Sequence, residues 1–130
     1  MTTELTVLAW GCVLALVHVF AAVIAKTMQY GSKWNMGSRD EALPPPNPLV
    51  GRLARAQANF FETFPVMIGA VLIVHAAGLA NGWTGWGAIL WLGARVAYLP
   101  IYALGIPGLR SLVFLVGVLG IALVLSPALT

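Results

Sequence analysis

Four polar side chains recur along one side of the segment that begins near residue 50. They are Arg52, Arg55, Asn59 and Glu62. If the segment is a helix, the four lie within a sector of about 80° and span roughly 15 Å. Guanidinium groups bind carboxylates and phosphates through paired N–H donors, whereas a carboxylate binds an ammonium group. The stripe therefore has the chemistry to bind a small molecule that carries charges of both signs.

A second polar set lies near the end of the third apolar segment. Arg95, Tyr98 and Tyr102 follow one another at i, i+3 and i+7, and so share a helix face. Arg110 and Ser111 open the last apolar segment. Antiparallel packing of these segments would gather both sets at one end, where four arginines face only one glutamate. This excess predicts a ligand with several carboxylates and net negative charge.

A structural role is the alternative for these charges. An ion-pair network with arginines reaching to the lipid headgroups would also account for them. Arg52, at the start of its segment, fits that interpretation. We expect Arg95 and Glu62 to sit deeper, and ionisable groups at membrane depth usually mark functional sites.

The elements that position these residues are predicted to cross a membrane. Of the 130 residues, 60% are hydrophobic and 8% are charged, and the mean hydropathy is +0.91. We therefore predict one domain, 1–130, that is an integral membrane protein. The sequence has no basic patch with interleaved aromatic residues, so the net charge of +3 does not indicate a nucleic-acid surface. We interpret the positive residues as markers of membrane topology and as ligand contacts. We expect no nucleic-acid partner and no metal site, and we expect the single Cys12 to be buried.

Four apolar segments predict an all-α, up-down, four-helix bundle, because backbone groups in lipid must be satisfied within each segment. The predicted spans are Leu5–Ala25, Leu49–Ala77, Thr84–Leu104 and Leu109–Leu125. Pro127 should end the last one. Trp83, Trp86 and Trp91 are interpreted as an aromatic belt at the membrane surface.

The polar stretch 27–48 joins the first two spans. Because it contains the run Pro44-Pro45-Pro46, we expect it to be extended and not helical. It would serve as a surface connector or, alternatively, as a lid over the polar stripe. The positive residues of this stretch, and Arg110 in the turn before the last span, place both loops at the cytoplasmic side by the positive-inside rule. Both termini are then predicted on the opposite side.

The motifs resemble those of a known family. Arg55-Ala56-Gln57-x-Asn59-x-x-Glu62-x-x-Pro65 and Arg95-x-x-Tyr98-x-x-x-Tyr102, followed by Arg110, are similar to the signature of the membrane-associated proteins in eicosanoid and glutathione metabolism (MAPEG). This family includes microsomal glutathione transferases and the leukotriene-forming and prostaglandin-E-forming synthases. The resemblance covers essentially the whole chain.

The resemblance implies a homotrimer of four-helix subunits, with glutathione bound between neighbouring subunits and open to the cytoplasm. It also implies which residues hold the tripeptide: Arg55, Asn59, Glu62, Arg95, Tyr98 and Tyr102, with Gln57 from the adjacent subunit. Arg110 would face the sulfur. Two positions depart from some members of the family, namely Ala58 in place of an arginine and Phe114 in place of a tyrosine. These departures bear on the substrate more than on the fold.

Three functions are compared. The first is a glutathione transferase or glutathione-dependent peroxidase that uses glutathione as co-substrate and acts on lipophilic electrophiles. In this enzyme Arg110 and Ser111 would stabilise the thiolate. The second is a non-catalytic membrane protein of the same fold that binds glutathione or another anion. The third is a small cation exporter, which would need an unpaired membrane carboxylate. We rank it last because Glu62 is outnumbered by arginines.

Overall fold

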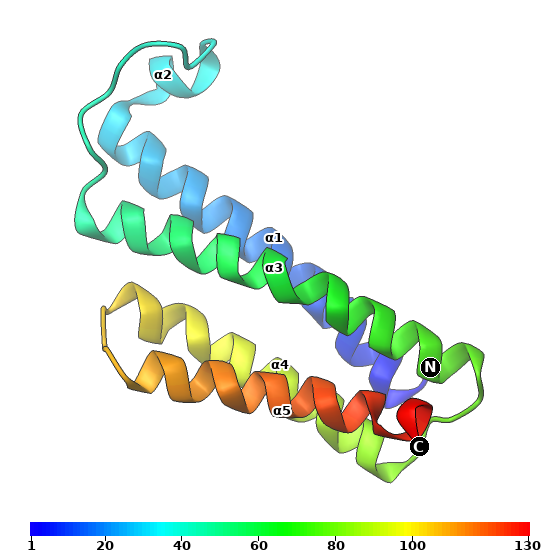
Figure 1. The fold of residues 1–130 in the computed structure, drawn as a ribbon. Coiled ribbons are helices and arrows are strands. Elements are labelled where there is room, and N and C mark those ends of the chain that lie inside the picture. Colours follow the sequence, from blue (N-terminus) through cyan, green and yellow to red (C-terminus); the bar gives the residue numbers. More distant parts are fainter.

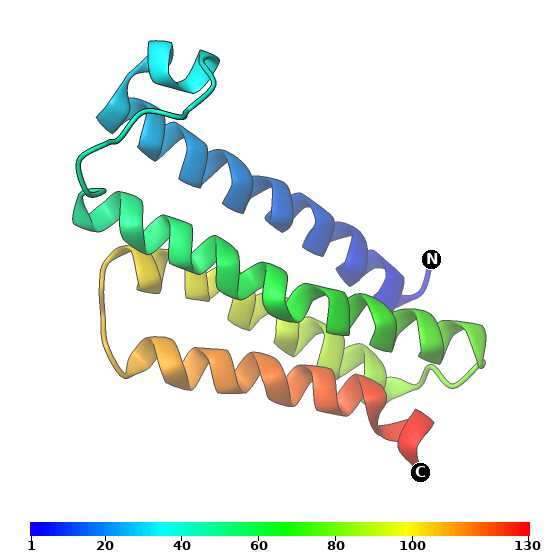
Figure 2. The same ribbon diagram turned by 45° about the horizontal axis from the view of Figure 1, so that its top comes forward.

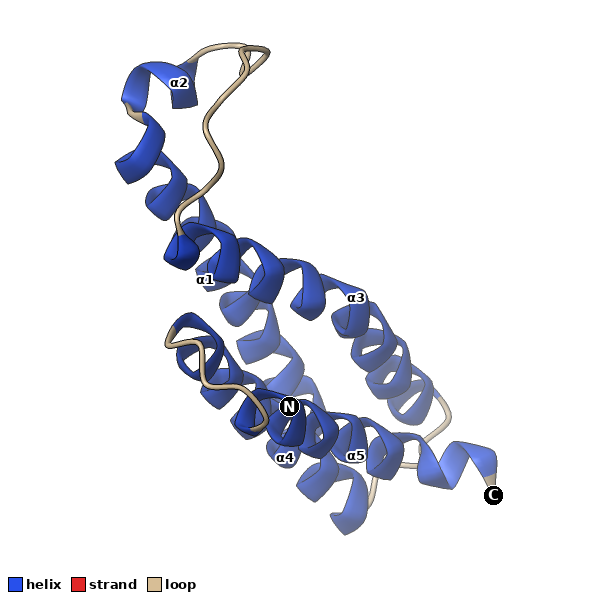
Figure 3. Ribbon diagram, turned by 60° about the vertical axis from the view of Figure 1, so that its left-hand side comes forward, coloured by secondary structure: helices blue, strands red, loops and turns tan.

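The computed structural model describes residues 1–130, and all of its regular elements are helices (Figures 1 and 3). They are α1 (Thr3–Tyr30), α2 (Ser32–Met36), α3 (Pro48–Ala76), α4 (Gly82–Ala103) and α5 (Leu109–Leu129). The all-helical prediction is confirmed. The predicted number of helices was wrong, because there are five and not four.

The four long helices alternate in direction and form two pairs. α1 lies beside α3, and α4 lies beside α5 (Figures 1 and 2). α4 contacts each of the other three long helices. Both termini and the α3–α4 loop lie at one end, whereas α2 and the α4–α5 turn lie at the other (Figure 1). The residues near the two charged loops are thus brought to the same end, as the sequence predicts.

Three helices, α1, α3 and α5, are long and apolar enough to cross a membrane. α4 was predicted as a fourth span but does not reach the same hydropathy over its length. It carries the buried Arg95, and its other buried positions include Thr84 and four small residues. The low hydropathy of α4 therefore follows from residues that it places against the other helices.

The stretch 27–48 is more helical than predicted. α1 continues to Tyr30, and α2 forms a further short helix over 32–36. The proline run limits only residues 43–48, since the residue before a proline is also restricted. Gly31, at φ 95°, separates the two helices. After α2 the chain returns as a loop that is hydrogen-bonded to the end of α1. The Tyr30 hydroxyl donates to the carbonyl oxygen of Pro44. The Gln29 side chain donates to the carbonyl oxygen of Pro45 and accepts from the backbone N–H of Asn47.

The last helix also ends later than predicted. α5 continues through Pro127 to Leu129. A proline at this position cannot donate to the carbonyl of Leu123, four residues earlier. The Ser126 hydroxyl donates to that carbonyl instead, at 2.8 Å. The local loss of one helical hydrogen bond is thereby offset, and the helix is not interrupted.

The main core lies where all four long helices meet, with Ile121 and Val124 contributed by α5. Phe64 stacks on Trp91 with ring centroids 5.7 Å apart and planes 11° apart, and Phe60 packs beside both rings. The interpretation of Trp91 as part of an aromatic belt was wrong, because its side chain is fully buried. Trp83 and Trp86 are exposed, as a belt requires. Cys12 was expected to be buried but is exposed, since it lies on the outer face of α1.

The α4–α5 pair is joined by glycines. A Cβ atom at Gly120 would lie 2.6 Å from the carbonyl oxygen of Gly87, and a Cβ at Gly87 would lie 2.7 Å from that of Gly120. Both values are shorter than a van der Waals contact, so the two backbones touch only because both residues lack side chains. This contact brings α5 close enough to cover the buried side of α4.

A buried carboxylate joins α1 to α4 near the termini. Glu4 is only 4% exposed and accepts a hydrogen bond from the Thr84 hydroxyl. Asn81 and Thr84 form a capping box at the start of α4. An anion at a helix N-terminus is favoured by the helix dipole. Glu4 thus acts structurally, at the end of the molecule opposite the charged loops.

Candidate functional site

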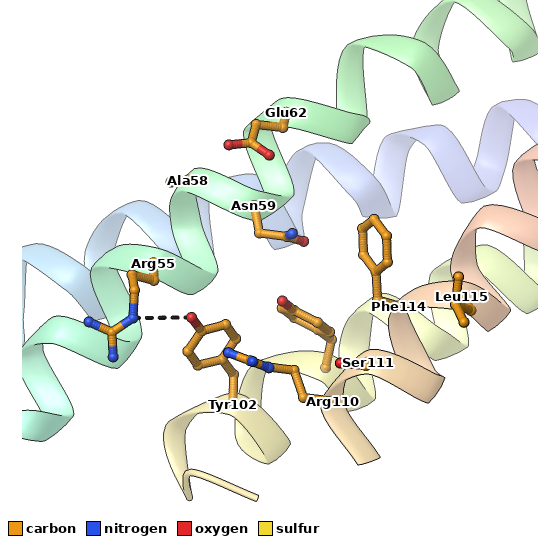
Figure 4. Close-up of a pocket in the computed structure, with 10 residues that line it drawn as sticks. Arg55, Ala58, Asn59, Glu62, Tyr102, Arg110, Ser111, Phe114 and Leu115 are labelled. Atoms are coloured by element: carbon orange, nitrogen blue, oxygen red, sulfur yellow. Dashed lines mark hydrogen bonds between the residues drawn. The ribbon is translucent and has the colours of Figure 1, made fainter. Parts of the chain in front are cut away.

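An open cavity of about 520 Å³ lies between α3, α4 and α5, toward the end that carries the α4–α5 turn (Figure 4). Seven of its lining residues are those that the sequence singled out. They are Arg55, Asn59, Glu62, Tyr98, Tyr102, Arg110 and Ser111. The predicted convergence of the polar stripe on α3, the tyrosine face of α4 and the start of α5 is therefore observed.

Both arginines of the cavity are held by Tyr102. The Nε atom of Arg55 donates to the Tyr102 hydroxyl at 3.1 Å. The guanidinium carbon of Arg110 lies 4.7 Å from the centre of the same ring, a distance at which cation–π attraction operates. Tyr98 packs edge-on against Tyr102 at 5.5 Å. Tyr102 thus contacts both positive groups at the cavity wall (Figure 4).

Arg95 is placed behind the cavity and does not line it. Its side chain is 2% exposed, and its guanidinium carbon lies 4.3 Å from the centre of the Tyr98 ring. Nη1 donates to Asn59 Oδ1 at 2.8 Å, whereas Nε and Nη2 have no hydrogen-bond partner in the chain. Arg95 was expected to be deep, and it is. Arg95 influences the cavity through its hydrogen bond to Asn59, which lines it.

Glu62 lies near the middle of α3 but is exposed at the surface of the chain. Its place near the middle of α3 (Pro48–Ala76) agrees with the expectation that it lies deeper along the helix than Arg52. Its position at i+3 from Asn59 puts it on the rim of the cavity, where the side chain faces outward from α3 (Figure 4). A carboxylate on the rim can still bind a ligand ammonium group.

Two predicted residues lie elsewhere. Gln57 points to the α1 side of α3, where it lines a separate cavity of about 250 Å³ together with Lys26, Trp34 and Arg39. Arg52 lines a third cavity, of about 180 Å³, beside the α4–α5 turn. The stretch 27–48 contributes nothing to the wall of the cavity of about 520 Å³ between α3, α4 and α5. In this structure it is a connector and not a lid.

The opposite wall of the cavity is apolar. Phe114 and Leu115 of α5 lie on the far side from Arg55 (Figure 4), and Ala58 lies on α3 between Arg55 and Glu62. Sequence reasoning did not name Leu115. The signal was present, because Leu115 follows Ser111 by four residues and so shares its helix face. The cavity therefore has a cationic end and an apolar end.

The charges of the lining leave a net positive site. Arg55 and Arg110 contribute two positive charges against the single negative charge of Glu62, and Arg52 and Arg95 lie directly next to the cavity. Guanidinium groups bind carboxylates with paired donors. The cavity is suited to an anionic molecule that also carries an ammonium group and an apolar or polarisable part.

Comparison with known proteins agrees with the resemblance. The sequence model of the MAPEG family matches residues 7–129, a range that includes every residue of the cavity. A search of curated proteins finds no match.

Proposed function

The chain belongs to the MAPEG family, and on this premise we propose that it is a membrane-bound glutathione transferase or glutathione-dependent peroxidase for lipophilic electrophiles. It is a multi-pass integral membrane protein, with three helices that can cross a bilayer. The observation that carries the proposal is the single cavity in which Arg55, Arg110 and Glu62 meet the tyrosine pair.

Glutathione matches the cavity group by group. It has two carboxylates, one ammonium and an ionisable thiol. Arg55 supplies free N–H donors for a carboxylate, and the Asn59 amide offers its N–H groups because Arg95 occupies Oδ1. Glu62 is available to the ammonium. These contacts account for a ligand with net negative charge in a cavity with net positive charge.

The acceptor substrate is proposed to enter from the lipid side. Phe114 and Leu115 form the apolar wall of the cavity, and Leu112 and Leu115 are exposed on α5. A lipophilic electrophile concentrated in the bilayer would reach the cavity along this face. Glutathione would instead enter from the aqueous end at the α4–α5 turn, which we place in the cytoplasm by the positive-inside rule.

Arg110 is proposed to activate the thiol. The thiolate is the nucleophile, and a free thiol with a pKa of about 8.5 is mostly protonated at neutral pH. A fixed cation beside the sulfur lowers that pKa. The Ser111 hydroxyl supplies a further donor. The thiol proton leaves to water, the thiolate sulfur bonds to the electrophilic atom, and the displaced bond or leaving group takes the electron pair. No general base is needed.

A second subunit is proposed to complete the site. Gln57 lies away from the large cavity of its own chain, whereas the rim residue Glu62 is exposed. In a homotrimer, Gln57 of one chain would approach the glutathione bound by its neighbour. The neighbour would also cover the outward side of Glu62.

The substitution Arg110→Ala tests the proposal. We expect glutathione binding to stay within severalfold of wild type. The pH midpoint of conjugation should rise toward the free-thiol value of about 8.5. The thiolate absorbance of bound glutathione should fall in parallel. Lys33→Ala, which removes one exposed charge from α2, serves as the matched control.

Two other results would contradict parts of the proposal. An unchanged pH–rate profile in Arg110→Ala would assign thiol activation to another residue, with Tyr98 and Tyr102 the nearest candidates. Glutathione binding by the wild type without turnover of any electrophile in a broad panel would favour the non-catalytic alternative.

A further inference from the structure

We propose that the cavity of about 180 Å³ beside the α4–α5 turn is a second anion site, which takes a phosphate group. It is lined by three arginines, one tyrosine and the turn itself: Arg52, Arg55, Tyr102, Gly105, Ile106, Pro107 and Arg110. Arg52 belongs to this cavity and not to the glutathione cavity.

The three guanidinium groups converge without an acidic residue. The lining contains no aspartate or glutamate. Three cations held close together near an apolar interior repel one another, and the repulsion is relieved when an anion binds between them. The cavity is therefore electrostatically suited to an anion.

Each arginine is anchored by a contact that leaves most of its donors available. Arg52 Nη1 donates to the carbonyl oxygen of Ala103 at a long 3.4 Å. Arg55 uses only its Nε for Tyr102. Arg110 rests on the Tyr102 ring at 4.7 Å. A guanidinium has five N–H donors, so all three side chains can donate to a bound anion while they keep these contacts.

The turn is shaped to admit the Arg52 side chain. Gly105 has a φ of 70°, and a Cβ atom there would lie 2.7 Å from the guanidinium carbon of Arg52. Any other residue would be strained at this φ and would push Arg52 away. Glycine thus allows the third cation to lie against the turn and to face the other two.

Phosphate fits this arrangement better than a single carboxylate does. A carboxylate offers two acceptor oxygens, whereas a phosphate group offers three or more and so can accept from three forked donors at once. The volume corresponds to about six water molecules, enough for a phosphate group with some of its hydration. The group can belong to a lipid headgroup or to a soluble phosphate, because the cavity lies at the end of the spanning helices.

Occupancy of this site would affect the neighbouring chemistry, a consequence that rests on the proposed function. Arg55 and Arg110 line both cavities. A phosphate bound to Arg110 would offset its positive charge and so raise the pKa of the glutathione thiol. Bound phosphate is then an inhibitor of conjugation near neutral pH that does not need to occupy the glutathione cavity.

A thermal shift of the detergent-solubilised protein, without glutathione, tests the site directly. Sodium phosphate is compared with sodium chloride at equal ionic strength. We expect phosphate to raise the Tm of the wild type and of the charge-matched control Lys33→Gln, but not of Arg52→Gln. Arg52→Lys keeps the charge without the fork, and we expect severalfold weaker phosphate binding. Absence of a phosphate-specific shift in the wild type, or its survival in Arg52→Gln, would overturn the proposal.

Two further measurements identify the source of the phosphate and separate the two cavities. Nanodiscs of phosphatidylcholine with and without phosphatidic acid show whether a lipid headgroup stabilises the wild type more than Arg52→Gln. If only inorganic phosphate does so, the ligand is soluble. Displacement of glutathione by phosphate that persists in Arg52→Gln would place phosphate in the large cavity and refute the second site. If the protein does not catalyse conjugation but the second anion site exists, the phosphate-dependent rise in Tm is still expected, so the two proposals are tested separately.

Discussion

Arg95 is a full positive charge in the interior of the helices, and its geometry gives it a positioning role. It donates one hydrogen bond, to Asn59 Oδ1, and its guanidinium lies against Tyr98. With Oδ1 occupied, Asn59 presents only its N–H donors to the cavity. Arg95 therefore selects a carbonyl or carboxylate oxygen as the ligand atom at this position.

The substitution Arg95→Met tests this role. Replacement of a buried charge by a hydrophobic residue of similar length is often neutral or stabilising, so we expect the Tm without ligand to be maintained. Glutathione affinity should fall severalfold, because Asn59 is no longer oriented. In Arg95→Met/Asn59→Ala, affinity should be no weaker than in Asn59→Ala alone, since coupled residues are non-additive.

Binding titration of the two single variants and the double variant measures this coupling. Additive losses would mean that Arg95 contacts glutathione directly, as the family resemblance implies. Helical spacing in the sequence put Arg95 and Tyr98 on one helix face and Asn59 in the polar stripe of another helix, and antiparallel packing predicted that the two meet. It could not show which of them faces the cavity, because helix rotation depends on packing against residues that are distant in the sequence.

At the scale of helices, hydropathy located every long element, but the ends depended on local hydrogen bonds. Pro127 was read as a stop, and Ser126 compensates for it. Residues 27–36 were read as extended because prolines follow, although the prolines act only on their immediate neighbours. Glu4 directly precedes the predicted span Leu5–Ala25, and its burial against Thr84 depends on a contact between α1 and α4 that the sequence does not show.

The Gly87–Gly120 contact predicts which glycines the fold requires. Gly120→Ala places a Cβ 2.6 Å from the Gly87 carbonyl oxygen, so α4 and α5 must separate. Overpacking of this kind costs about 1–3 kcal/mol, and the Tm should fall. The control is Gly93→Ala in α4, the helix that also carries Gly87, because a Cβ atom at Gly93 would meet no atom within 4 Å. Equal melting temperatures for the two variants would show that the helix pair is looser than the structure indicates.

At the scale of the molecule, one chain carries a polar cavity on the α1 side of α3. Gln57, Lys26 and Arg39 line it, at the end of the molecule that carries α2 (Figure 1). A neighbouring subunit would bury them. The periodicity of the sequence carries no information on subunit number, so a trimer stays a prediction that follows from family membership.

Native mass spectrometry in mild detergent measures the assembly. We expect three copies of the chain, with bound glutathione increasing the proportion of trimer because the ligand would contact two subunits. Monomers or dimers alone, with glutathione binding intact, would show that a single chain or a pair completes the site.

During synthesis, α4 leaves the ribosome before α5, and only residues 104–108 separate the two helices. A helix that carries Arg95 partitions poorly into lipid by itself. α5 covers this region, since a Cβ at Gly117 would lie 3.7 Å from Arg95 Cδ. We therefore expect the two helices to enter the bilayer as one hairpin. With the α4–α5 turn on the cytoplasmic side, a glycosylation reporter in that turn should stay unmodified in chains that include α5 and become glycosylated in chains that end before residue 109, because α4 alone would fail to stop in the bilayer. An unmodified reporter in the shorter chains would contradict coupled entry.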